Sequence, residues 1–248
     1  MTIWISLGFK MKIGNKEIKF TSILFIVLTI LITLGIILSI SIYYIDTANK
    51  KTLVTNDLGT VTLEGPFGNT NSSDKIAFIV GVHPLESNSH ISLLNNIRNN
   101  DKNLNKSYYI YIINVTKDRN DFEKGRMNGQ LLARDYVVPD IKNKKYDFVV
   151  DVHSHRGVYL EKNFIISPLD DSKSSEIGLN VISDIEGMKI LKYIPEDGGD
   201  PTSPEYVSIP ILKNGTSTLI YETFLNESET ATNTFIEKFI KNLDKYVF

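Results

Sequence analysis

Two histidines and a glutamate stand where apolar runs of this chain end. His83 and Glu86 close the stretch AFIVGVHPLES, and His153 lies at the end of YDFVVDVHSHRG. Two imidazoles and one carboxylate are a sufficient protein ligand set for a catalytic zinc ion, because one position stays open for water. Although His-x-x-Glu alone is a common pattern, its position after a predicted strand predicts a Zn²⁺ site formed by His83, Glu86 and His153.

A further carboxylate, Glu222, ends a later apolar run, TSTLIYETF, with Tyr221 beside it. An acidic side chain at the end of a buried strand is costly unless it is paired or functional. As a general base, Glu222 would take a proton from a water molecule whose pKa the metal lowers to about 7. These residues indicate metal-assisted hydrolysis of an amide, with Tyr221 as a substrate contact. A salt bridge at the sheet edge is the alternative for Glu222.

Several arginines could act beside such a metal. A fixed guanidinium polarises a scissile carbonyl or binds a substrate carboxylate through two hydrogen bonds. Arg119 and Asn120 come soon after a predicted strand end, Arg126 follows, and Arg156 comes directly after the histidines. We assign Arg119 to the carbonyl, and Asn120, Arg126 and Arg156 to substrate binding, although the pattern does not rank the arginines firmly. Arg134 is expected to be a solvated helix charge.

The segment DVHSHRG contains two histidines that could serve the metal. Strand alternation places Asp151, His153 and His155 on one side of the strand. His153 is nearer the strand end and is the predicted ligand, and Asp151 could orient an imidazole from behind. His155 is a competing ligand or a substrate contact. Hydrogen-bonded histidines of a surface loop are the alternative for both.

The pattern of apolar segments predicts how these residues are positioned. Unbroken Val/Ile/Phe runs alternate with amphipathic helices, which is typical of an α/β fold with a mostly parallel (mixed) central sheet and helices on both faces. We expect strands at 76–82, 108–115, 146–152, 163–167, 188–194 and 217–223, and helices around 90–98, 123–136, 174–185 and 228–246. In such sheets the functional site lies beyond the carboxyl ends of the strands, where His83, His153 and Glu222 fall.

The N-terminal region has a different character. Residues 20–45 contain no charged residue, and as a helix they would span roughly 39 Å, longer than the ~30 Å hydrocarbon core of a bilayer. We expect a transmembrane anchor at 20–45 rather than a cleavable signal peptide. The lysines before it predict a cytoplasmic tail at 1–19 and an extracytoplasmic remainder. Residues 46–75 are then a linker and hairpin, and 76–248 form the α/β domain.

Composition excludes several other kinds of site. The chain of 248 residues has a net charge of −2 and no cysteine, so thiolate metal sites, disulfides and a cysteine nucleophile are ruled out. No basic stripe interleaved with aromatic residues appears, which disfavours nucleic acid as a partner. A Gly-x-Ser-x-Gly motif is also absent from the sequence, which disfavours a serine hydrolase.

The order of these motifs resembles the zinc carboxypeptidase clan, nearest its succinylglutamate desuccinylase/aspartoacylase branch. The resemblance covers roughly residues 76–225 and rests on His83-x-x-Glu86, the Arg119–Asn120 pair, Asp151-x-His153 and a late Glu222. It implies one zinc held by His83, Glu86 and His153, Glu222 as general base, and an arginine of the Arg119 segment at the carbonyl. Two departures stand out: Pro84 replaces the usual small residue, and the usual Asn-Arg order is inverted.

The sequence therefore predicts a membrane-anchored, extracytoplasmic, zinc-dependent amide hydrolase of the carboxypeptidase or deacylase type. Its substrate would be a peptide or an acylated amino acid, and the predicted topology favours a peptide of the cell envelope or an exogenous one. The alternative is a non-catalytic extracytoplasmic binding or scaffold module on the same fold, which Pro84 and the inverted pair favour. The two differ in whether the donor atoms of His83, Glu86 and His153 lie roughly 3–3.5 Å apart, as about 2 Å metal bonds require.

Overall fold

The computed structural model describes residues 10–13 and 16–248, and the chain divides into two compact units, 1–49 and 50–248. The first unit contains an antiparallel hairpin of β1 (Lys10–Ile13) and β2 (Lys16–Lys19), followed by helix α1 (Phe20–Ala48). The hairpin falls within the predicted tail, of which residues 1–9, 14 and 15 lie outside the described residues.

Helix α1 is apolar over most of its length. Its Ser22–Ser39 window has a mean hydropathy of 2.8 and no buried residue. The hydroxyls of Thr29, Thr33 and Ser39 each donate to the carbonyl four residues earlier, at 2.6 to 2.8 Å, so these polar groups are satisfied within the helix. With 29 residues the helix is about 44 Å long. It is long and apolar enough to be a membrane span or a signal sequence.

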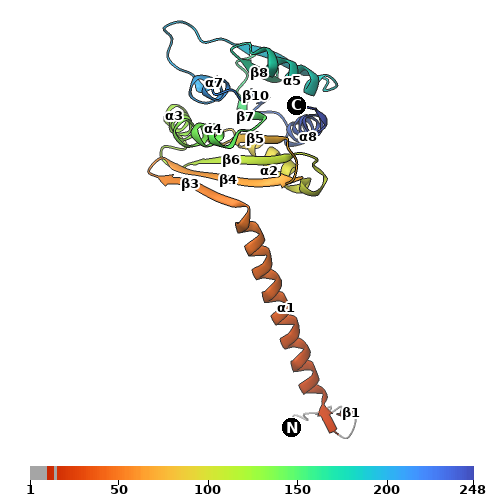
Figure 1. The fold of residues 1–248 in the computed structure, drawn as a ribbon. Coiled ribbons are helices and arrows are strands. Elements are labelled where there is room, and N and C mark those ends of the chain that lie inside the picture. Colours follow the sequence, from red (N-terminus) through yellow and green to blue (C-terminus); the bar gives the residue numbers. More distant parts are fainter. Residues whose placement is uncertain (1–9, 14–15) are drawn as a thin grey trace. The chain divides into compact units, whose positions relative to one another are not determined.

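The second unit is built on an eight-stranded mixed sheet of order β3-β4-β6-β5-β7-β10-β8-β9 (Figure 1). The central strands β6 (Ser107–Val115), β5 (Lys75–Val80), β7 (Phe148–His155) and β10 (Ser217–Phe224) are parallel. The hairpin of β3 (Lys50–Asn56) and β4 (Gly59–Gly68) adds antiparallel strands at one edge. At the other edge β8 (Asn163–Pro168) runs antiparallel to β10 and parallel to β9 (Met188–Tyr193).

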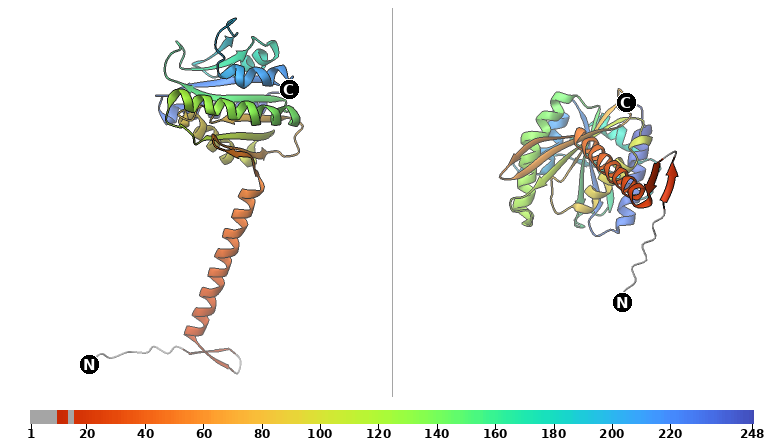
Figure 2. Two further views of the ribbon diagram at one scale, coloured as in Figure 1. Left: turned by 90° about the vertical axis from the view of Figure 1, so that its left-hand side faces the viewer. Right: turned by 90° about the horizontal axis from the view of Figure 1, so that it is seen from below.

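Helices cover both faces of this sheet (Figures 1 and 2). One face packs against α2 (Ser87–Asn99), α5 (Ser172–Ile182) and α8 (Glu229–Lys245), and the other against α3 (Phe122–Leu132), α4 (Val138–Lys144) and α7 (Ser208–Lys213). Because strand residues point alternately to the two faces, Phe78 joins the first core and Ile79 the second, and both are fully buried. This double burial explains the unbroken apolar runs of the central strands.

The predicted fold class is confirmed, a mixed sheet with helices on both sides and one apolar helix before it. The boundary at residue 76 differs, because β4 pairs with β6 from Gly59 to Gly68 and the 50–68 hairpin is therefore part of the sheet. The helix expected at 123–136 also extends further. A π-helical turn at Ala133–Val137 leads into α4, and the Val138 N–H donates to the Ala133 carbonyl five residues back.

The region after β9 contains two short helices that were not predicted from the sequence. Helices α6 (Ser203–Tyr206) and α7 lie between the strands expected at 188–194 and 217–223. Pro204 and Pro210 make this segment read as a loop, although proline is well tolerated in a first helical turn. Burial of Ile209 and Ile211 fixes α7 against the sheet.

Candidate metal centre

The three predicted ligands come from the carboxyl ends of two adjacent parallel strands. His83 follows β5, Glu86 is the residue before α2, and His153 lies two residues before the end of β7. Gly81 makes the sharp exit from β5 possible, since its φ is +88° and a Cβ there would lie 2.0 Å from the Ile113 carbonyl oxygen. The turn that follows is closed by the Glu86 N–H, which donates to the His83 carbonyl at 3.2 Å.

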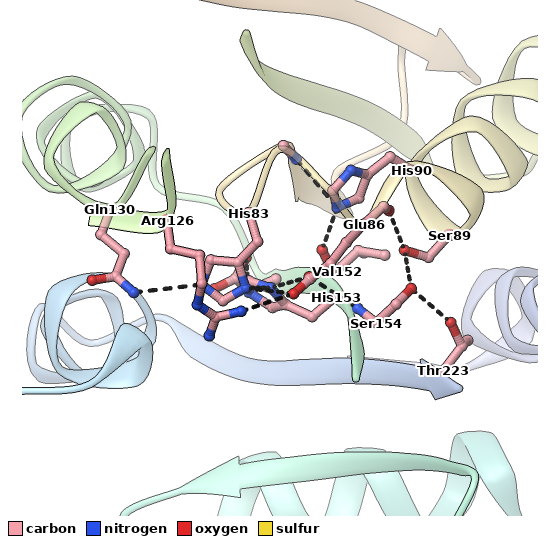
Figure 3. A network of polar contacts seen from close by, with 12 residues as sticks. His83, Glu86, Ser89, His90, Arg126, Gln130, Val152, His153, Ser154 and Thr223 are labelled. Atoms are coloured by element: carbon pink, nitrogen blue, oxygen red, sulfur yellow. Dashed lines mark hydrogen bonds and ion pairs between the residues drawn. The ribbon is translucent and has the colours of Figure 1, made fainter. Parts of the chain in front are cut away.

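The donor atoms of these three side chains converge on one point (Figure 3). His83 Nδ1 lies 2.9 Å from Glu86 Oε1 and 2.9 Å from His153 Nδ1, and His153 Nδ1 lies 3.0 Å from Glu86 Oε2. All three residues are buried, and one ligand atom of each lies within 4.8 Å of the others. Tetrahedral bonds of about 2 Å would separate the donors by roughly 3.3 Å. An outward shift of a few tenths of an ångström therefore fits a zinc ion.

An ion pair behind His153 and a hydrogen bond to Glu86 hold these two ligands in place. Asp151 Oδ1 lies 3.0 Å from His153 Nε2, so the other nitrogen, Nδ1, faces the centre. The Ser154 N–H donates to Glu86 Oε2 at 3.0 Å. His90, a buried residue of α2, contacts the Val152 carbonyl at 3.0 Å through Nε2 (Figure 3). A carboxylate behind a ligating imidazole is typical of zinc sites, where it orients the ring and raises its basicity.

The remaining ligand, His83, is backed by an amide side chain. The amide nitrogen of the buried Gln130, on α3, lies 3.4 Å from His83 Nε2. A His83 ring that binds metal through Nδ1 carries its proton on Nε2, and this N–H needs an acceptor. The Gln130 amide oxygen can take that place, because the oxygen and nitrogen of an amide exchange positions when the group is turned over. Gly129 lets α3 come this close, because a Cβ there would lie 1.9 Å from the Val82 carbonyl oxygen.

The electrostatics of the cluster favour a cation. Burial lowers the pKa of His83 to about 4, so this ring is neutral at pH 7. Burial opposes ionisation of Glu86, but the adjacent imidazoles hold its pKa well below the ordinary value. Burial also opposes charge on His153, yet the Asp151 carboxylate raises its pKa well above the usual range. The metal-free site therefore holds one imidazolium between two carboxylates, and a cation could replace its proton.

The centre opens into a cavity of about 200 Å³. Its walls combine apolar side chains with many charged and polar ones. The residues that line it are His83, Pro84, Leu85, Glu86, Asp121, Phe122, Arg126, Ser154, His155, Arg156, Val158, Tyr159, Glu222 and Leu225. The cavity lies at the carboxyl ends of the central strands, where the sequence places the functional site.

Glu222 lies beside the centre, on β10. Its Cα pairs with that of His153 in the sheet, and its side chain lines the cavity. The Oε2 atom is buried and has no hydrogen-bond partner. Burial raises the pKa of the Glu222 carboxyl to about 8. A buried carboxyl whose oxygen is left unpaired is a candidate for a functional role, because a purely structural one would be costly.

The structure separates the predicted arginines. Arg126, on α3, lines the cavity and donates to Glu86 Oε1 at 3.1 Å. Arg156 also lines it, with its guanidinium 4.2 Å from the Phe122 ring centroid. Arg119 is exposed and donates instead to Asn114 Oδ1 at 3.0 Å. Neither Arg119 nor Asn120 lines the cavity, because the turn after β6 carries them toward solvent before α3 begins.

One predicted residue, Tyr221, lies outside the cavity, and one residue that was not predicted, Tyr159, lines it. Tyr221 is 1% exposed, packs on Phe239 in the core, and does not line the cavity. Strand alternation explains this, because neighbouring residues such as Tyr221 and Glu222 point to opposite faces. The cavity contains Tyr159 instead, from the loop after β7. The Val-Tyr-Leu triplet in an otherwise polar loop is the signal that could have indicated it.

Comparison with known proteins supports the fold. No protein-family model and no curated protein matches the sequence. Among solved structures, it is similar to a metallo-carboxypeptidase from Burkholderia cenocepacia, with a TM-score of 0.54 at 11% identity over 79% of this chain and 64% of that one. A putative carboxypeptidase A from Shewanella denitrificans gives 0.54 at 17% identity, over 79% and 63%.

A third similar structure is the cell shape determinant Csd4 of Helicobacter pylori bound to a tripeptide. Its TM-score is 0.51 at 12% identity, over 74% of this chain and 54% of that one. This chain thus spans less than two thirds of the length of each of these proteins. The predicted resemblance is confirmed at the level of the fold, and the chain has the fold of the zinc carboxypeptidases.

Proposed function

We propose that this protein is a zinc-dependent amide hydrolase. The observation that carries the proposal is the convergence of His83, Glu86 and His153 at a cavity that also contains the carboxyl of Glu222. A non-catalytic module would not need three donors within hydrogen-bonding distance of one another beside an unpaired acid. When bound there, zinc would polarise the substrate carbonyl and make water a stronger acid.

Glu222 is the group that moves the proton. In the metal-free protein burial raises its pKa to about 8, and a nearby cation lowers the pKa of a carboxyl. The two effects together bring the pKa of Glu222 close to neutral pH, where a general base works best. Glu222 would take a proton from the attacking water and return it to the leaving amine.

Arg126 is the residue that we assign to the substrate carbonyl. Its side chain contacts Glu86 and faces the cavity, whereas Arg119 lies outside. A fixed guanidinium stabilises the negative charge that develops on the carbonyl oxygen. Arg156, whose guanidinium lies over the Phe122 ring, supplies a second positive charge for a substrate carboxylate.

The size of the cavity favours a substrate cleaved near one end. Its volume of about 200 Å³ is below the ~300–1,000 Å³ of pockets that enclose drug-sized ligands. It suits one residue or one acyl group rather than a long segment. Both a carboxypeptidase and a deacylase of acylated amino acids meet this requirement, and a peptide is the substrate class that we favour.

The topology is part of the same proposal. Helix α1 would anchor the chain in the cell membrane, with its lysine-rich N-terminal side in the cytoplasm and the catalytic unit outside. An envelope-derived or exogenous peptide would then reach the site more readily than a cytoplasmic metabolite. Protease added to intact cells tests this. Cleavage of the 50–248 unit without lysis supports it, and protection until lysis contradicts it.

Activity is tested with the full chain in detergent micelles. Peptides with free and amidated carboxyl termini and N-acyl amino acids are offered before and after chelation and zinc repletion. We expect hydrolysis that chelator abolishes and zinc restores, and a Glu222→Gln variant slower by about 10²–10⁴-fold. Arg119→Ala is the matched surface control. Zinc-loaded protein that hydrolyses none of these substrates contradicts the proposal.

A further inference from the structure

His155 is the second histidine of the Asp-x-His-x-His segment and ends β7, two residues after His153. It is 7% exposed and lies on the same side of the strand as His153. By position alone it is a second candidate for the metal. Its ring, however, faces the loop 156–162. His155 Nδ1 accepts from the Gly157 N–H at 3.1 Å, and Nε2 donates to the Lys162 carbonyl at 3.0 Å.

These two partners determine the chemical state of the ring. An N–H group faces Nδ1, which must therefore carry a lone pair, and a carbonyl faces Nε2, which must carry the proton. With these partners the proton of the uncharged ring lies on Nε2, and both nitrogens are already used. No nitrogen of His155 is free for a metal in this conformation, so the two histidines of the segment have different tasks.

The two hydrogen bonds join the beginning of the loop to its end. Gly157 takes the positive φ of +96° that turns the chain back, a conformation that other residues rarely adopt. The His155 ring also packs against Tyr159, Phe164 and Phe224, with centroids 5.3, 5.2 and 5.9 Å away. His155 thus contacts the beginning, the middle and the end of the loop.

Apart from His155, the loop is held by two ring contacts: the Arg156 guanidinium lies 4.2 Å from the Phe122 ring centroid, and the Tyr159 and Phe164 centroids are 4.8 Å apart. Val158 is 83% exposed and Leu160 is fully exposed, so the tip buries almost no apolar surface. Yet Arg156 and Tyr159, from the same loop, line the cavity. Both residues belong to a segment whose first and last parts are joined by the hydrogen bonds of one imidazole.

We propose that His155 is a positioning residue: a clasp that holds the loop 156–162 at the cavity so that Arg156 and Tyr159 face the substrate. It does not bind the metal. The consequence for substrate rests on the proposed function, whereas the clasp itself does not.

The wild-type protein tests the clasp directly. The chain has only four histidines, so ¹⁵N-histidine labelling of the full chain in micelles gives a resolvable ring spectrum. We expect His155, assigned by loss of its signal in His155→Phe, to show the Nε2–H tautomer before and after zinc is added. The ring nitrogens of His83 and His153 should shift with zinc. A zinc-induced shift of a His155 nitrogen to a ligated value, or an Nδ1–H or doubly protonated His155 at neutral pH, overturns the proposal.

The variant His155→Phe removes both hydrogen bonds and keeps an aromatic ring. We expect its zinc stoichiometry and affinity to stay within about twofold of wild type, because the ligand set is intact. Trypsin should cut after Arg156 and Lys162, both exposed, about tenfold faster, which corresponds to the loss of roughly one net hydrogen bond. Cutting after Lys213, at the end of α7, is the internal control and should not change. KM should rise about tenfold with a smaller change in kcat.

His155→Asn restores an acceptor near the Nδ1 position and should recover part of the protection. Loss of zinc in His155→Phe, or unchanged trypsin cutting of the loop, contradicts the clasp. If His155→Phe does not fold, the wild-type tautomer decides, with the signal assigned through His155→Asn. A protein without hydrolase activity would contradict the proposed function alone, since the tautomer and the trypsin rates do not depend on turnover.

Discussion

Replacing Glu222 by Gln should change how the stability of the metal-free protein depends on pH. Burial raises the Glu222 pKa from an ordinary 4.5 to about 8. The folded protein therefore keeps this proton up to pH 8, whereas the unfolded chain releases it near 4.5. The carboxyl contributes stability in full below pH 4.5 and loses that contribution as pH rises to 8. Glutamine cannot titrate, so the variant should not show this loss.

The size of the effect follows from the shift. A difference of about 3.5 pH units at ~1.4 kcal/mol each gives a ceiling of about 5 kcal/mol. The pKa of about 8 already includes the nearby charge of His153, which stabilises the ionised form. The stability of Glu222→Gln minus that of wild type should therefore grow by a few kcal/mol between pH 4.5 and 8. Groups common to both proteins cancel in the difference.

The assay is urea unfolding of chelator-treated full chain in micelles, followed by circular dichroism between pH 4.5 and 8.5. With zinc bound, the pH dependence of the difference should flatten, because the cation lowers the Glu222 pKa. A difference that is independent of pH without metal would mean that Glu222 is ionised and solvated in the native protein. The argument for its role as a base tuned by burial would then fail.

Three other outcomes are expected. Arg126→Ala should lower kcat/KM by about 10²-fold or more through loss of charge at the carbonyl, while Arg119→Ala leaves it unchanged; equal effects in steady-state kinetics would contradict the assignment. Asp151→Asn should weaken zinc binding about 10–100-fold by chelator competition, and unchanged affinity would exclude its role behind His153. Zinc affinity should rise with pH, up to about tenfold per unit below the raised pKa of His153, because the metal must displace the proton of the His153 ring. A zinc affinity that stays constant between pH 5.5 and 7.5 would argue against this proton displacement.

Much of the fold could be predicted because the central strands are buried on both faces. That burial leaves unbroken apolar runs in the sequence, as in the Phe78–Ile79 pair, and the ends of those runs mark the site edge. His83, Glu86 and His153 were predicted for this reason, since adjacent parallel strands bring their carboxyl ends together. Edge strands carry a weaker signal, which is why the hairpin 50–68 was not assigned to the sheet.

The arginines show what the pattern could not resolve. The distance of a residue from a strand end says little about direction once the chain has left the strand. Arg119 leaves toward solvent, whereas Arg126 returns to the cavity only because α3 packs closely at Gly129. Tyr221 was misplaced by one step of strand alternation. The role of His155 depends on hydrogen bonds to Gly157 and Lys162, and no spacing in the sequence encodes them.

The most direct test of the account is the zinc content of the purified full chain. The three-donor centre predicts about one zinc per chain by elemental analysis after reconstitution and removal of free metal. Glu86→Gln and His153→Ala should lose it, while His155→Phe, a histidine change just outside the centre, should keep it. Wild-type protein that retains no zinc, or that retains it equally in Glu86→Gln and His153→Ala, would contradict the central claim.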